Sequence, residues 1–354
     1  MSTTPIARGS LYALGAACLF GLTAPLLKRY GATDGAFATA AVLYAGAALG
    51  AGPWQLRRQQ GLARERPLGA RELRRVALVA VFGAALAPTA LAWGLAHSGA
   101  AAGALLLNLE ALFTVLLARA VHREPTGPRV ALAVALMLAG GALLALRTGP
   151  LGASEALGLG AIALATLFWA LDNTLSRPLA DFDPRVVVFV KAALGAGLSA
   201  SLALVLRERW QAHYELAGLF VCGFLGYGVS LGLYLRAQRV LGAARTGSLF
   251  AVAPFVGAAF AYALGDRTGV GLMGAAAVLF ALAVYLHVTE RHAHHHVHEP
   301  LEHEHAHRHD DGHHEHVHDP PVAGSHSHPH RHSRIEHEHP HGSDLHHRHR
   351  HRGG

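Results

Sequence analysis

An acidic residue lies in the middle of an apolar stretch that is long enough to cross a lipid bilayer. The stretch runs from Gly99 to Glu124 (GAAAGALLLNLEALFTVLLARAVHRE), and Asn108 and Glu110 lie near its centre. A helix of about twenty apolar residues spans the hydrocarbon core. A carboxylate at that depth costs about 3 kcal/mol on insertion scales, so chains rarely keep one without a use for it. The sequence therefore predicts a membrane-spanning helix that carries a functional polar group.

Most of the remaining chain has the same character. Hydrophobic residues make up 52% of the 354 residues and charged residues 15%, whereas soluble domains carry about 25% charged residues. Helices are the expected structure of such segments, because a helix satisfies its backbone groups internally. Ten apolar segments can be marked, at approximately 10–28, 35–54, 76–96, 99–118, 128–146, 156–176, 184–206, 216–235, 246–265 and 269–288. The first 290 residues are therefore predicted to form an all-α integral membrane domain.

The distribution of basic residues predicts the orientation of the segments. Lys and Arg concentrate in the loops that share a side with the N-terminus, above all in the loop 57–75 with its seven arginines. Positively charged loops remain in the cytoplasm. Both termini are therefore expected to be cytoplasmic, in a bacterial inner membrane. The lipid bilayer is the expected partner, no nucleic-acid motif is present, and a homodimer is one option for the assembly.

The chain also repeats itself. LFGLTAPLLKR at 19–29 matches LFWALDNTLSR at 167–177, and GALLLNLEALF at 103–113 matches GSLFAVAPFVG at 247–257. Five spans in each repeat is an odd number, so the two halves must lie oppositely in the membrane. Inverted repeats are typical of secondary transporters, whose site lies near the midplane between the halves. The predicted division is a first repeat at 1–150, a second repeat at 151–290 and a tail at 291–354.

These features resemble the EamA-type members of the drug/metabolite transporter superfamily. The resemblance covers all ten segments and includes the small residues that enter 99–118 and 246–265, Pro254 in APF, and the acidic Glu124 with Asp266 as a less clear counterpart. The segments LLLNLEALFT, FWALDNTLSR, FLGYGVS and ARTGSLFAVAPF are similar to one recurrent subgroup. The resemblance implies a ten-helix bundle that alternates between inward-open and outward-open states. Glu110 stands where most members have Pro, so no known substrate is transferred to this chain.

Charged residues inside the segments are the candidates for the site. At 1.5 Å per residue, Lys191 and Asp172 lie at similar depths, and the lysine stem brings Glu110 within its reach. Lys191 is therefore predicted to meet Asp172 or Glu110, either as a brace for helix packing or as part of a site for a charged substrate or a proton. The other candidates for substrate binding or coupling are Asn173, Asn108, Trp93, Tyr227, Tyr234 and Arg245.

The tail from Arg291 to Gly354 is of different composition. It holds 24 of the 28 histidines, alternating with acidic residues, Arg and Pro, without apolar periodicity, so disorder is expected. Neutral imidazoles bind Zn, Ni, Co and Cu, and the tail is expected to bind such a divalent metal, although no cofactor is required. The candidate ligands are His294, His295, His296, His298, His303, His305, His307, His309, His313, His314, His316 and His318.

The preferred interpretation is a secondary transporter of a small organic metabolite, with proton coupling as an option. A divalent metal (Ni, Zn or Co) transporter that uses the tail is the first alternative, and a non-transporting membrane metal sensor or store is the second. An enzyme is not expected, because no Ser/His/Asp set, Cys/His nucleophile or phosphate-binding loop is visible.

Overall fold

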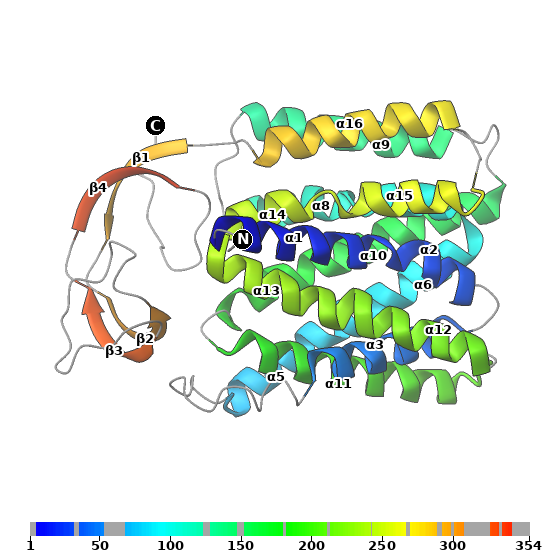
Figure 1. The fold of residues 1–354 in the computed structure, drawn as a ribbon, viewed down its shortest axis with the longest axis horizontal. Helices are drawn as coiled ribbons and strands as arrows, with labels where there is room; N and C mark the ends of the chain where they lie inside the picture. The colour runs from blue at the N-terminus through cyan, green and yellow to red at the C-terminus, as the bar shows by residue number, and fades with distance from the viewer. Residues whose placement is uncertain are drawn as a thin grey trace.

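Long helices lie side by side in a bundle (Figure 1). The structure is a computed structural model, and it describes residues 5–31, 35–52, 68–122, 128–146, 152–179, 182–210, 213–241, 243–266, 270–288, 292–298, 301–307, 326–332 and 335–341.

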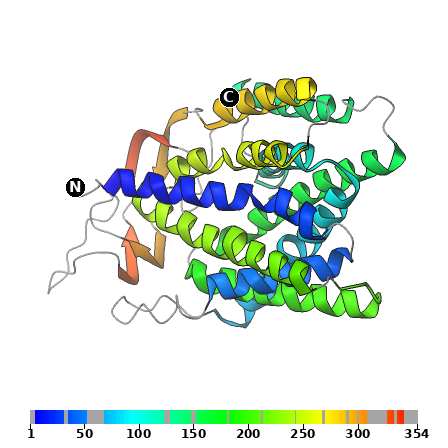
Figure 2. The same ribbon diagram turned by 45° about the vertical axis from the view of Figure 1, so that its right-hand side comes forward.

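The helices of the first half are α1 (Pro5–Gly21), α2 (Thr23–Gly31), α3 (Ala36–Ala51), α5 (Ala70–Ala80), the π-helix η1 (Val81–Leu86), α6 (Ala87–His97), α7 (Ala100–Leu106), α8 (Leu109–His122) and α9 (Pro128–Leu146). Those of the second half are α10 (Ala153–Ser176), the short 3-10 helix η2 (Arg177–Leu179), α11 (Pro184–Val205), α12 (His213–Gly223), the π-helix η3 (Phe224–Val229), α13 (Ser230–Leu241), α14 (Ala243–Phe250), α15 (Ala253–Ala263) and α16 (Val270–Val288). Helices α11 and α3 pack together, as do α10 and α6, and α1 and α13. Helices α9 and α16 form a pair at one edge of the bundle (Figure 2).

The protein is a multi-pass membrane protein with a helical membrane domain. Among the described residues, seven helical segments are long and apolar enough to cross a bilayer, and three shorter apolar helices, Ala36–Ala51, Pro128–Leu144 and Gly271–Leu286, fall in the remaining predicted segments. Large apolar side chains such as Leu157 and Val205 are more than 60% exposed on the outside of the bundle, as expected where lipid replaces water. The number of ten spans stays a prediction.

The two halves share their irregularities. The third predicted span is α5–η1–α6 and the eighth is α12–η3–α13, each with a six-residue π-helix in its middle. The fourth span breaks at residues 107–108, between α7 and α8, and the ninth breaks at 251–252, between α14 and α15. The sequence match of 103–113 with 247–257 aligns these two breaks. The repeat seen in the sequence is therefore also a repeat of local backbone geometry.

Small residues let the backbones of α3 and the α12–η3 segment touch. A Cβ added to Gly223 would lie 1.8 Å from the carbonyl oxygen of Leu43, and one added to Gly46 would lie 2.2 Å from that of Phe220. Membrane helices gain packing energy from this kind of close approach, because lipid offers no hydrophobic drive for association. The interface therefore requires glycine at these positions.

The end of the bundle opposite the N-terminus is called the far end below (right in Figure 1). Charged side chains there form hydrogen bonds with the termini of helices. Glu208 Oε2 accepts a hydrogen bond from the Ala38 backbone N–H at 2.9 Å, and Asp266 Oδ2 accepts one from Ala101 N–H at 3.0 Å. The N-cap residues of α3 and α7 are glycines without a capping side chain of their own. Both caps therefore come from the opposite half of the chain, and they satisfy helix N–H groups that lack intrahelical partners.

The C-terminus of α6, also at the far end, accepts hydrogen bonds from a lysine side chain. Lys28 Nζ donates to the carbonyl oxygens of Ser98 at 2.8 Å and Ala96 at 3.3 Å. A cation at this position is favourable, because the last carbonyls of a helix carry partial negative charge.

The tail is not disordered in its described parts, which corrects the expectation for them. Strands β1 (His292–His298) and β4 (Ile335–His341) pair antiparallel, as do β2 (Leu301–His307) and β3 (His326–His332). The alternation of His with other residues has a period of two, which suits extended backbone. The prediction of disorder considered only that the tail has too few apolar residues to form a core, and it did not consider this period.

The close approach of α3 and α12 gives a stability prediction. Gly223→Ala is expected to destabilise the bundle by about 1–3 kcal/mol, because the new methyl group overlaps the backbone of Leu43. Gly160→Ala is the matched control, since nothing lies within 4 Å of a Cβ at that helical position. The melting temperature of each detergent-purified variant measures the effect, and equal melting of the two variants would contradict the packing argument.

Candidate functional site

The carbonyl oxygen of Gly83 accepts hydrogen bonds from two other helices. It bonds the Tyr44 hydroxyl of α3 at 2.7 Å and Trp169 Nε1 of α10 at 3.1 Å. In a π-helix a carbonyl accepts from the N–H five residues on, and the residue five positions after Gly83 is Pro88, which has no N–H to donate. Gly83 lies inside η1, and the irregular turn thereby supplies an acceptor that ties three helices together.

Gly83 also makes room for a carboxylate. A Cβ added to Gly83 would lie 2.1 Å from Asp172 Oδ2 of α10. On the other side of η1, a Cβ added to Gly195 of α11 would lie 2.3 Å from the Ala84 Cβ atom. Segment η1 therefore packs between α10 and α11, and glycine on both sides keeps the three segments close.

Lys191 pairs with Asp172, as predicted. Its Nζ donates to Asp172 Oδ2, and Ser176 Oγ donates to the other carboxylate oxygen, Oδ1, at 3.2 Å. The side chains of Asp172 and Lys191 are 4% and 22% exposed. A buried charge of either sign is costly without its partner. The positive charge of Lys191 is therefore balanced inside the protein.

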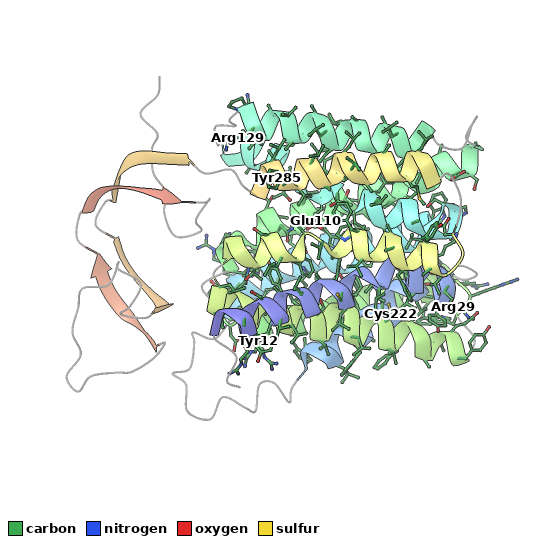
Figure 3. All side chains as sticks on the ribbon, turned by 45° about the horizontal axis from the view of Figure 1, so that its top comes forward. Tyr12, Arg29, Glu110, Arg129, Cys222 and Tyr285 are labelled. Atoms are coloured by element: carbon green, nitrogen blue, oxygen red, sulfur yellow. The ribbon has the colours of Figure 1, made fainter. Side chains whose placement is uncertain are left out.

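Glu110 has a neutral partner. Its Oε1 accepts a hydrogen bond from Asn173 Nδ2 at 2.8 Å, and Thr114 Oγ1 donates to its backbone carbonyl at 2.8 Å. Glu110 lies two residues after the break in the fourth span, near the middle of the length of the bundle (Figure 3). Within the described part of the chain, the only partner of its carboxylate is this amide.

A chain of aromatic rings runs through five helical segments close to this carboxylate. Tyr227 of η3 lies 5.5 Å from both Tyr44 and Phe20, measured between ring centroids. Phe250 of α14 lies 5.4 Å from Phe20 and 5.0 Å from Tyr234 of α13. Tyr44 bonds the Gly83 carbonyl, Gly83 packs against Asp172, and the next residue, Asn173, bonds Glu110. The rings and the carboxylate therefore belong to one region of the bundle.

The Tyr227 hydroxyl is buried in this region and has no hydrogen-bond partner of acceptable geometry among the described residues. The Thr23 side chain adjoins it, but the Thr23 hydroxyl donates to the carbonyl oxygen of Phe20 at 2.6 Å. Buried hydroxyl groups are nearly always paired, so this one is a candidate contact for a ligand.

The other predicted site residues are not joined to this group by the described contacts. Asn108 is buried, and its Nδ2 bonds the carbonyl of Leu105 in its own helix at 2.8 Å. Trp93 is 39% exposed and stacks on His97 at 4.1 Å between ring centroids. The side chain of Arg245 lies outside the described residues, as do all side chains of the tail. In the described part, no group of three or more His, Cys, Asp or Glu side chains could hold a metal ion.

Sequence reasoning missed Gly83, Tyr44, Trp169 and Ser176. Trp169, Asp172 and Ser176 follow one another at spacings of three and four residues, which places them on one face of α10. That spacing was a usable signal. Gly83 itself gave none, although Pro88 five residues later marks a helical carbonyl that can lack its N–H partner.

An apolar groove lies between α1–α2 and α12–η3, and Thr23, the neighbour of Tyr227, is part of its lining. Its lining includes Leu22, Tyr30, Val221 and Cys222 and no charged side chain. Its chemistry suits a lipid chain, whereas the region of Glu110 and Lys191 holds the charges. The polar region is therefore the candidate site.

Comparison with known proteins gives a consistent result. The family model described as "EamA-like transporter family" matches residues 7–146 and 156–289. An "Uncharacterized transporter" from Methanothermobacter thermautotrophicus is 29% identical over 192 residues, which are 52% of this chain and 55% of that protein. The chain thus spans about half the length of this curated relative. A solved structure described only as "Crystal structure of protein" shares the fold, with a TM-score of 0.58 and 19% identity over 79% of this chain and 96% of that one.

The Lys191–Asp172 pair gives a prediction for a double-mutant cycle. Lys191→Met and Asp172→Asn are each expected to destabilise the protein by about 3–5 kcal/mol, because each leaves one buried charge unpaired. The double variant should recover most of the loss. Thermal unfolding of the purified variants measures this, with Arg71→Gln on the exposed face of α5 as control. Additive losses in the double variant would contradict the pairing.

Proposed function

Because the chain belongs to the EamA-like transporter family, we propose that it is a secondary transporter that moves a small organic metabolite across the membrane by alternating access. The observation that carries this proposal is the Glu110 carboxylate, which lies beside a helix break at mid-depth and is bonded only by the neutral amide of Asn173 among the described residues. Transporters place such groups at broken helices near the interface of their repeats. In keeping with the prediction from sequence, the ten spans would leave both termini in the cytoplasm of a bacterial cell.

Glu110 is the coupling group in this proposal. An intramembrane carboxylate without a cationic partner can exchange a proton more readily than one fixed in an ion pair. Protonation removes the charge of Glu110. The Asn173 amide donates a hydrogen bond to the carboxylate form, and its carbonyl oxygen can accept one from the protonated form. The two forms would differ in their affinity for substrate, which is the requirement for coupling.

Lys191 and Asp172 act as positioning residues. The sequence suggested Lys191 as a contact for an anionic group, but its ammonium group is bonded to Asp172. Asn173 follows Asp172 directly in α10. By fixing Asp172 against Gly83, the pair fixes the helix that presents the Asn173 amide to Glu110.

The alternative of metal transport receives no support from the membrane domain, whose described residues hold no cluster of metal-binding side chains. We propose that divalent metal binding is confined to the tail as an accessory property. The strand register supports this, because His294 lies opposite His339, His296 opposite His337, and His303, His305 and His307 opposite His330, His328 and His326. Cross-strand neighbours lie close enough for paired ligands. Of the predicted ligands, His309, His313, His314, His316 and His318 lie outside the described residues.

Replacement of Glu110 tests the transport proposal. Glu110→Gln is expected to abolish solute uptake driven by a pH gradient, because the amide cannot exchange a proton. Solute-dependent proton movement in proteoliposomes measures this, in a screen of organic metabolites. The matched control is Glu215→Gln at the start of α12, which should transport normally. A Glu110→Gln variant with wild-type proton coupling would remove Glu110 from the mechanism.

Truncation after Arg291 tests the role of the tail. The shortened protein is expected to lose at least about tenfold in Zn²⁺ or Ni²⁺ affinity, because clustered imidazoles are the ligands these metals prefer. Solute transport should stay within about twofold of the full chain. Metal titration and transport assays on the same preparation measure both. Loss of all transport on truncation would instead indicate that tail and bundle form one pathway for metal.

A further inference from the structure

We propose that the region around Glu110 binds a small organic cation, an amine or quaternary ammonium ion, as the substrate of the proposed transporter. This inference rests on the proposed function and specifies the chemical class of its solute. It follows from three observations on described residues: the charge balance of the polar group, the aromatic chain beside it, and an unpaired hydroxyl within that chain.

The charge balance favours a cation. The group holds two carboxylates and one ammonium, and Lys191 is bonded to Asp172. The remaining charge is that of Glu110, whose only hydrogen-bond partner among the described residues is the neutral Asn173 amide. An anionic solute would meet this negative charge in a medium of low dielectric constant, where repulsion is strong. A solute with one positive charge would neutralise it.

The aromatic chain favours an organic cation over an inorganic one. Tyr227 packs against both Tyr44 and Phe20, and Phe250 packs against Phe20 and edge to face against Tyr234. The faces of aromatic rings attract ammonium groups whose methyl or methylene groups spread the charge. Inorganic cations instead need several oxygen ligands, and the described part of the region offers few of them.

The unpaired Tyr227 hydroxyl indicates a contact that the protein does not itself supply. It is buried between the rings of Phe20 and Tyr44 and lacks a hydrogen-bond partner in the described structure. A solute with an N–H or O–H group near its cationic centre would satisfy it. The groups also come from both halves of the chain: Glu110, Phe20 and Tyr44 from the first, and Tyr227, Tyr234 and Phe250 from the second. A cation bound between them would contact both repeats.

Matched probes test the inference. Choline and benzyltrimethylammonium have neutral isosteres, 3,3-dimethyl-1-butanol and neopentylbenzene, that differ in charge and not in shape, and 3,3-dimethylbutanoate is the corresponding anion. Binding to the full-length protein in lipid nanodiscs would be measured by equilibrium dialysis in 150 mM NaCl. At least one cation is expected to bind roughly tenfold or more tightly than its isostere. Equal binding of the isostere, or a preference for the anion, would overturn the inference.

Variants locate the binding. Glu110→Gln should remove the preference for the cation, Glu110→Asp should retain it, and Tyr227→Leu and Tyr234→Leu should weaken it by about threefold to tenfold. Glu215→Gln and Tyr214→Leu remove the same groups from the exposed start of α12 and should bind as the wild type does. Unchanged preference in Glu110→Gln would place the cation elsewhere and sink the inference, and the wild-type comparison decides the matter even where a variant does not fold.

Counterflow of the same probes in proteoliposomes separates this inference from the proposed function. If ammonium probes bind but are never exchanged, the protein binds cations and the transport proposal fails. If only neutral or anionic solutes are exchanged, and this depends on Glu110, transport stands and the assignment to cations is wrong.

Discussion

The ion pair between Lys191 and Asp172, buried against Gly83, is the interaction on which the geometry of the candidate site depends. The charges must pair because neither is tolerable alone in a bilayer. Their pairing requires η1 to lie between α10 and α11 without a side chain at Gly83. The same π-turn releases the Gly83 carbonyl, which Tyr44 and Trp169 occupy. One irregular turn thus aligns α3, α10 and α11, and α10 carries the amide that bonds Glu110.

The two repeats share a backbone and differ in chemistry. Their aligned breaks place Glu110 in the first half where Pro254 stands in the second. The first half contributes the carboxylate, and the second contributes the amide and most of the aromatic rings. A duplicated scaffold therefore supports an asymmetric site, in which each half supplies what the other lacks.

The sequence was sufficient for the features that depend on composition and spacing. Apolar length predicted the helices, the internal match predicted the repeat, and the cost of an isolated ammonium predicted the pairing of Lys191. The sequence could not reveal contacts that depend on how distant helices pack. The choice of Asp172 over Glu110 as the partner of Lys191 depends on the position of η1, and the separation of Trp93 from the site depends on which face of α6 turns outward.

The tail shows a different limit. A chain without apolar periodicity was predicted to be disordered, but alternation with a period of two also matches a strand. A two-stranded ribbon is at best marginally stable in water, so composition alone could not decide between them.

The caps at the far end of the bundle have a consequence for the conformational equilibrium of the protein. Asp266 and Glu208, both from the second half, cap helices α7 and α3 of the first half. Separation of the two halves at that end would leave both helix N-termini without their acceptors. A lost cap costs about 1 kcal/mol, so the pair would favour closure of the far end by a population ratio of roughly thirty. Opening at the far end would therefore require favourable free energy from another interaction, and binding of a solute between the halves could supply it.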